Sequence, residues 1–102
     1  MSDLKIQVLG LLQFIEDSLL EGLKHPLTLA ECLSEADCAL RILRKLLEKD
    51  EMMLALFQIT PLSHFHFFIA GQQKTAAEKE DSINKCLKFV SATRALLCDP
   101  PL

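Results

Sequence analysis

The segment from Leu27 to Thr60 contains neither glycine nor proline, and its apolar residues recur at alternating steps of four and three. An α-helix turns once every 3.6 residues, so this spacing places those side chains along one side of a helix. This apolar stripe consists of Leu29, Leu33, Ala36, Leu40, Leu43, Leu47 and Leu54, and only its last two members are seven residues apart. A helix with so wide an apolar side must pack against other helices, and this requirement constrains the fold more than any other feature of the chain.

The start of this helix is predicted by Thr28-Leu29-Ala30-Glu31, which has the spacing of a capping box. In such a box the threonine hydroxyl accepts a hydrogen bond from the backbone N–H of the glutamate three residues later, and the glutamate side chain accepts one from the backbone N–H of the threonine. Leu27 and Cys32 occupy the positions of a hydrophobic staple. Two positions for the end of the helix are compatible with the sequence. The helix can run nearly to Phe57, or it can break at Lys49-Asp50 with Asp50 as the N-cap of a new helix.

Two further long helices are expected at the ends of the chain. The first should run from about Asp3 to Lys24, because Ser2 can cap it and His25-Pro26 should end it. The last should begin with Thr75-Ala76-Ala77-Glu78, a second capping box, and end at Cys98-Asp99-Pro100-Pro101.

A short helix of about ten residues is expected between Thr60-Pro61, where proline follows a threonine cap, and Gly71. The sequence therefore predicts an all-α fold, an antiparallel (up-down) bundle of three long helices plus one short Phe-rich helix. We expect residues 1–102 to form a single domain.

Composition excludes several classes of protein. The net charge is −3, and the densest basic cluster, at Arg41, Arg44, Lys45 and Lys49, is interrupted by acidic residues, so we expect no binding to nucleic acid. No stretch approaches the ~18 apolar residues of a membrane span, and the N-terminus does not have the pattern of a signal peptide. We expect a cytoplasmic protein with reduced cysteines.

Catalytic and cofactor motifs are not visible, so we expect a non-enzymatic protein without cofactors or a metal site. The chain has no phosphate-binding glycine loop, no G-x-S-x-G turn and no pair of cysteines with zinc-ligand spacing. The alternative is a small metal-binding protein or enzyme that uses His64, His66 and Cys86. On a strand the two imidazoles would share one side, whereas on a helix they diverge by about 200°.

An apolar patch for a partner is expected around the sequence HFHFF at residues 64–68. In either a helix or a strand, at least one of its three phenylalanines lies away from the side that the other two could share, and an exposed phenylalanine can contribute to an apolar patch. The nearby methionines have flexible side chains, which suit a surface that adapts to a partner. The predicted partner-binding residues are Met52, Met53, Leu56, Phe57, His64, Phe65, His66, Phe67 and Phe68. The partner is expected to be another protein, possibly a second copy of this chain. By class, we expect a regulator, an inhibitor such as an immunity protein, or a secretion co-chaperone.

Overall fold

The computed structural model describes residues 3–58 and 75–98, and it confirms the predicted all-α bundle. No strand occurs among these residues. The elements are α1 (Asp3–Lys24), the 3-10 helix η1 (Pro26–Thr28), α2 (Leu29–Leu47), α3 (Glu51–Gln58) and α5 (Ala76–Cys98). The short Phe-rich helix predicted over residues 61–71 lies outside the described residues.

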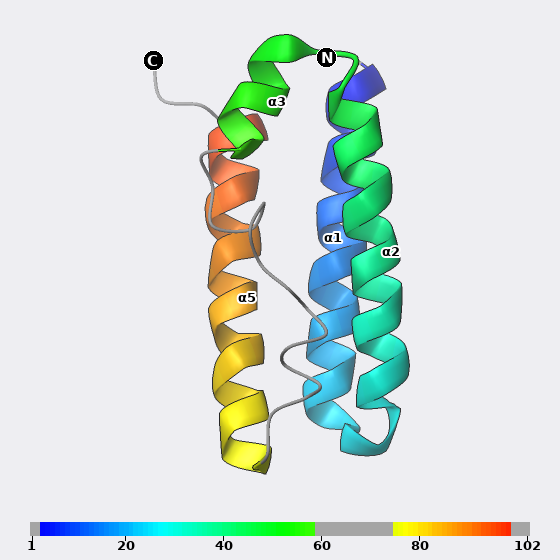
Figure 1. Ribbon diagram of the computed structural model, residues 1–102, viewed down its shortest axis with the longest axis vertical. Helices are drawn as coiled ribbons and strands as arrows, with labels where there is room; N and C mark the ends of the chain where they lie inside the picture. The colour runs from blue at the N-terminus through cyan, green and yellow to red at the C-terminus, as the bar shows by residue number, and fades with distance from the viewer. Residues whose placement is uncertain (1–2, 59–74, 99–102) are drawn as a thin grey trace.

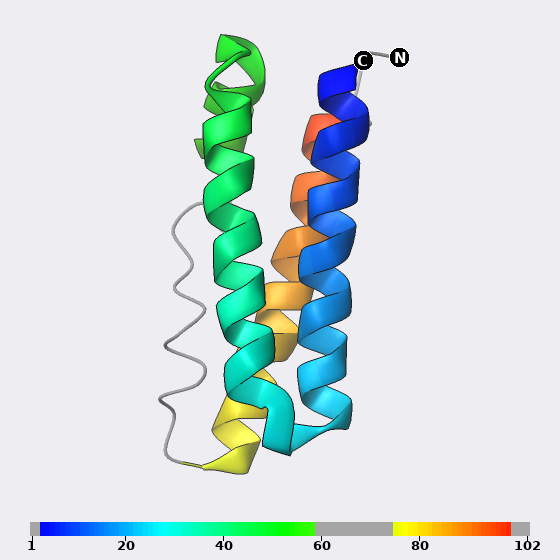
Figure 2. The ribbon, with the colours of Figure 1, turned by 90° about the vertical axis from the view of Figure 1, so that its right-hand side faces the viewer.

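Helix α1 lies beside both other long helices (Figure 1). It runs antiparallel to α2 and to α5, and the last two run in the same direction. Helix α3 crosses the end of the bundle from α2 and packs against the last turns of α5. Seen from the side of α1 and α2, these two helices stand in front and α5 lies behind them (Figure 2). One face of the α1–α2 pair is therefore directed away from α5.

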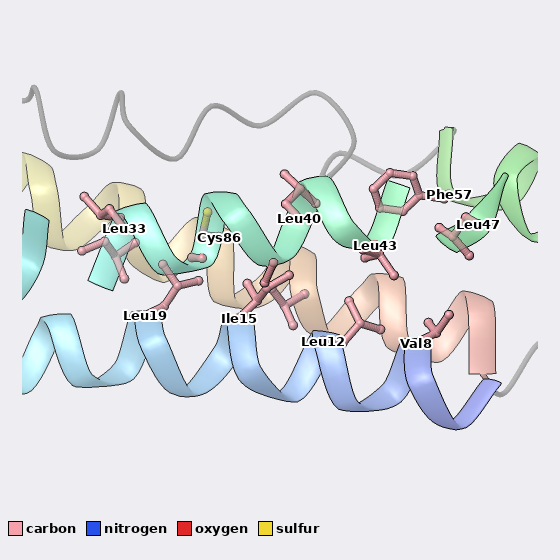
Figure 3. Packing of buried hydrophobic residues seen from close by; sticks show 14 of the residues in the cluster. Val8, Leu12, Ile15, Leu19, Leu33, Leu40, Leu43, Leu47, Phe57 and Cys86 are labelled. Atoms are coloured by element: carbon pink, nitrogen blue, oxygen red, sulfur yellow. The ribbon is translucent and has the colours of Figure 1, made fainter. Parts of the chain in front are cut away.

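The predicted leucine stripe of α2 forms the core with matching side chains from α1 and α5. Figure 3 shows Val8, Leu12, Ile15 and Leu19 of α1 directed toward α2. The fully or nearly buried apolar residues of the cluster are Val8, Leu12, Ile15, Leu19, Leu29, Leu33, Ala36, Ala39, Leu40, Leu43, Leu47, Phe57, Ile83, Cys86 and Val90. Burial of one leucine, isoleucine or valine side chain stabilises a fold by about 1.5–3 kcal/mol, so this cluster is the main source of stability.

The junction of α1 and α2 differs from the prediction. Helix α1 ends at Lys24 as expected, and His25 adopts φ −128° and ψ 81°, the extended conformation favoured before proline. The predicted capping box at Thr28 is wrong. Its φ of −98° and ψ of 5° are not those of an N-cap, and its hydroxyl donates instead to the His25 carbonyl, 2.8 Å away. Pro26 starts a 3-10 turn that leaves Leu27 fully exposed, so the predicted staple with Cys32 is also wrong.

The break between α2 and α3 occurs at Asp50, the second of the two possibilities in the sequence. The amides of residues 48–50 bond three residues back, to Lys45, Leu46 and Leu47, and this tight turn ends α2. Asp50 then caps α3, because its carboxylate oxygen Oδ1 accepts the amide of Met53 at 3.1 Å. Thr75 caps α5 as predicted, since its hydroxyl accepts the Glu78 amide at 3.0 Å.

Candidate functional site

The described part of the predicted patch does not form one apolar surface. Phe57 is 1% exposed and belongs to the core, and Met53 and Leu56 are partly buried against that core. Met52, with 74% of its surface exposed, is the member that is open to a partner. The other predicted residues, at 64–68, lie outside the described residues.

A groove on the face of α1 and α2 directed away from α5 is the better candidate for a binding site. It has a volume of about 330 Å³ and is almost entirely apolar. Leu11 and Phe14 line it from α1, and Cys38, Ala39 and Ile42 line it from α2, with Ser34 and Glu35 toward the start of α2. We call this the outer groove. Phe14 is 46% exposed and Ile42 is 57% exposed, although both are large apolar side chains.

The position of the outer groove follows from the directions of the α1 side chains. Val8, Leu12 and Ile15 point into the core. On one flank of this row Glu16 accepts a hydrogen bond from Arg94 of α5, which joins the two helices by a half-buried ion pair. Phe14 lies about 160° around the helix from Glu16, since each residue turns the helix by about 100°. The side of Phe14 therefore borders α2 and solvent rather than α5.

Charges of opposite sign lie at the two ends of the outer groove. At the end where α2 begins, the exposed acidic residues are Asp17, Glu21, Glu31 and Glu35. Of these, Asp17 accepts a hydrogen bond from Gln13 at 2.9 Å, and Glu21 lies 3.5 Å from the imidazole of His25. At the end where α2 stops, Lys45 and Lys49 are exposed. The α2 side of the outer groove is thus apolar in its middle, acidic where α2 begins and basic where α2 stops.

The thiols differ in what they can do chemically. Cys86, which the alternative metal or enzyme hypothesis uses, is fully buried in the core, and this burial raises the pKa of its thiol far above the usual range. Its side chain is therefore a neutral apolar group, neither a nucleophile nor a ready metal ligand. His64 and His66 lie outside the described residues. Cys38 is exposed in the outer groove.

Among residues 3–58 and 75–98, no group of three or more histidine, cysteine, aspartate or glutamate side chains could hold a metal ion. The helices in these ranges are also too short or too polar to cross a membrane. No family model, curated protein or solved structure matches the chain.

Sequence reasoning missed this groove, although two signals were present. Phe14 is an apolar residue that widens the stripe of α1, and Ile42 interrupts the charged side of α2 between Arg41 and Lys45. Each signal is weak by itself, because isolated exposed apolar residues are common on protein surfaces. The packing of α1 against α2 brings them to the same groove.

Proposed function

We propose that this chain is a non-catalytic protein–protein interaction module and that it binds its partner through the outer groove. One observation carries the proposal: Phe14 and Ile42 expose about half of their large apolar surfaces on the two walls of one groove. Burying such side chains against a partner removes apolar surface from water, and this stabilises a complex by about 25 cal/mol for each Å² buried. Contiguous exposed apolar surface of this kind is typical of protein interfaces.

The proposed role is that of a regulator, an inhibitor of the immunity-protein type or a secretion co-chaperone. All three act by covering or presenting a surface, which requires no catalytic group. We also propose that the protein acts in the cytoplasm. The three cysteines whose side chains the structure describes, Cys32, Cys38 and Cys86, are free thiols, the form expected in a reducing compartment.

Site-specific photo-crosslinking in cells of the source organism tests the binding surface. A photoreactive benzoylphenylalanine replaces Phe14 in one variant and Ile42 in another. The control carries it at Ser91, an exposed position of α5. We expect covalent protein adducts from positions 14 and 42 and few from position 91. Equal labelling at all three positions, or none, would refute the proposed surface.

Disruption of the same surface provides a second measurement. Phe14→Asp and Ile42→Asp each place a charge where the proposed partner packs, so each should abolish the crosslink formed at the other position. Both side chains are about half exposed in this structure, so helical circular dichroism should remain unchanged. Adducts that persist in both variants would show that the groove does not hold the partner.

A further inference from the structure

A second regular row of side chains follows the exposed side of α2. Its members recur at steps of four and three, and all of them are exposed: Glu31, Glu35, Cys38, Ile42, Lys45 and Lys49. Alternating steps of four and three are the spacing through which two helices pack along their length. Helix α2 thus carries one such row in the core and another along the edge of the outer groove.

The charges of this row reverse about its midpoint at residue 40. Counting outward from the midpoint, Cys38 corresponds to Ile42, Glu35 corresponds to Lys45, and Glu31 corresponds to Lys49. Each acidic position is therefore matched by a basic position at the same distance on the other side, with the apolar pair in the middle. Lys49 lies just past the end of α2, in the turn before α3. A row with this symmetry is complementary to a copy of itself that runs in the opposite direction.

We infer that a second copy of this chain occupies the outer groove, with the two α2 helices antiparallel about a two-fold axis at residue 40. This inference rests on the proposed function, because it names the partner of the same surface. In this arrangement Lys45 of each copy faces Glu35 of the other, and Ile42 faces Cys38. A two-fold interface of this type is self-complementary, as closed dimers require.

The other two-fold arrangement is disfavoured by charge. A two-fold axis parallel to the helices would place α1 of each copy against α2 of the other, and these two helices would run antiparallel as they do within one chain. Asp17 and Glu21 of one copy would then face Glu35 and Glu31 of the second copy. Like charges across an interface oppose association. These like charges favour the antiparallel dimer, in which the acidic half of the α2 row faces the basic half.

Single charge reversals test this geometry. Sedimentation at concentrations from about 10 to 500 µM and low salt should show a monomer–dimer equilibrium that weakens as salt is added, because exposed ion pairs are screened. Lys45→Glu replaces two symmetric attractions by two repulsions, and we expect it to raise the dissociation constant about tenfold or more. Glu35→Lys should do the same. Lys88→Glu, an exposed reversal on α5, is the control and should leave the equilibrium unchanged.

Combining the charge reversals at positions 35 and 45 distinguishes this dimer from any other. A mixture of Lys45→Glu chains with Glu35→Lys chains should form heterodimers, because each lysine of one chain then faces a glutamate of the other. The double variant Glu35→Lys/Lys45→Glu should also dimerise as the unmodified chain does. Failure of both combinations to restore association would overturn the antiparallel arrangement.

The same experiments separate this inference from the proposed function. A chain that stays monomeric up to about 500 µM at low salt, but forms crosslinks from position 14 with a different protein, overturns the second copy as partner and leaves the binding module standing. A monomeric chain that forms no crosslinks from positions 14 and 42 overturns both. A crosslinked species of twice the chain mass, removed by Lys45→Glu, supports both.

Discussion

Thr93 places a hydroxyl group in the core of the bundle. Its side chain is fully buried in α5, and its Oγ1 atom has no hydrogen-bond partner among the residues that the structure describes. Valine has the same branched shape, with a methyl group in place of the hydroxyl. An unpaired buried hydroxyl costs about 1–3 kcal/mol of desolvation, so Thr93→Val should remove that cost without opening a cavity. We expect the free energy of unfolding to rise by about 1–2 kcal/mol.

The corresponding change in melting temperature is large enough to measure. Unfolding entropy is about 2.1 cal/mol/K per residue, or about 0.2 kcal/mol/K for this chain, so each kcal/mol raises Tm by about 5 °C. Thr93→Val should therefore raise Tm by about 5–10 °C. Circular dichroism at 222 nm during urea and thermal unfolding is the suitable assay, because the chain has neither tryptophan nor tyrosine to report by fluorescence.

A matched control at the same position separates the hydroxyl from the methyl group. Thr93→Ser keeps the hydroxyl and loses one buried methyl, so it should be less stable than the unmodified protein by about 1 kcal/mol. A valine variant less stable than the threonine protein would refute the reasoning, since it would mean that the hydroxyl makes a stabilising hydrogen bond.

Substitutions at Asp50, at the two glycines of α1 and at Cys86 test the junction of α2 and α3, the packing of α1 and the buried thiol. Asp50→Ala removes the carboxylate that caps the Met53 amide and should lower the free energy of unfolding by about 1 kcal/mol in urea titrations, whereas Asp50→Asn should largely retain it. Gly10→Ala should stabilise α1 by about 0.5–1 kcal/mol, because no atom of the described residues lies within 4 Å of the added Cβ. Gly22→Ala should stabilise it less, because its Cβ would lie 2.9 Å from Leu29 Cδ1, and equal gains in the free energy of unfolding would contradict this packing. Burial raises the pKa of Cys86, so the folded protein keeps this thiol protonated at pH values where the unfolded chain, whose thiol ionises near pH 8.5, loses the proton. The contribution of Cys86 to the free energy of unfolding should therefore be constant below about pH 8.5 and should decline by up to about 1.4 kcal/mol per pH unit above it. In Cys86→Val this part of the slope should disappear, and an unchanged slope would show that Cys86 is not the group responsible.

The sequence was most informative where the geometry is local. The end of α1 at Lys24, the stripe from Leu29 to Leu47 and the threonine cap of α5 were all predictable, because helical spacing, proline and capping hydroxyls act within a few residues. The same rules failed at Thr28, where the 3-10 turn begun by Pro26 redirects the hydroxyl to the His25 carbonyl. The same rules did not decide whether the helix continues past Asp50 or breaks there.

By itself, the sequence determined that the chain forms long amphipathic helices that must bundle, because the repeat of its leucines matches the turn of a helix. Tertiary structure decided which apolar residues remain in contact with water. Phe57 is buried because α3 turns across the bundle, whereas Phe14 and Ile42 stay exposed because they border a face that no described helix covers. Burial depends on the neighbours that packing supplies, and those neighbours come from distant parts of the chain.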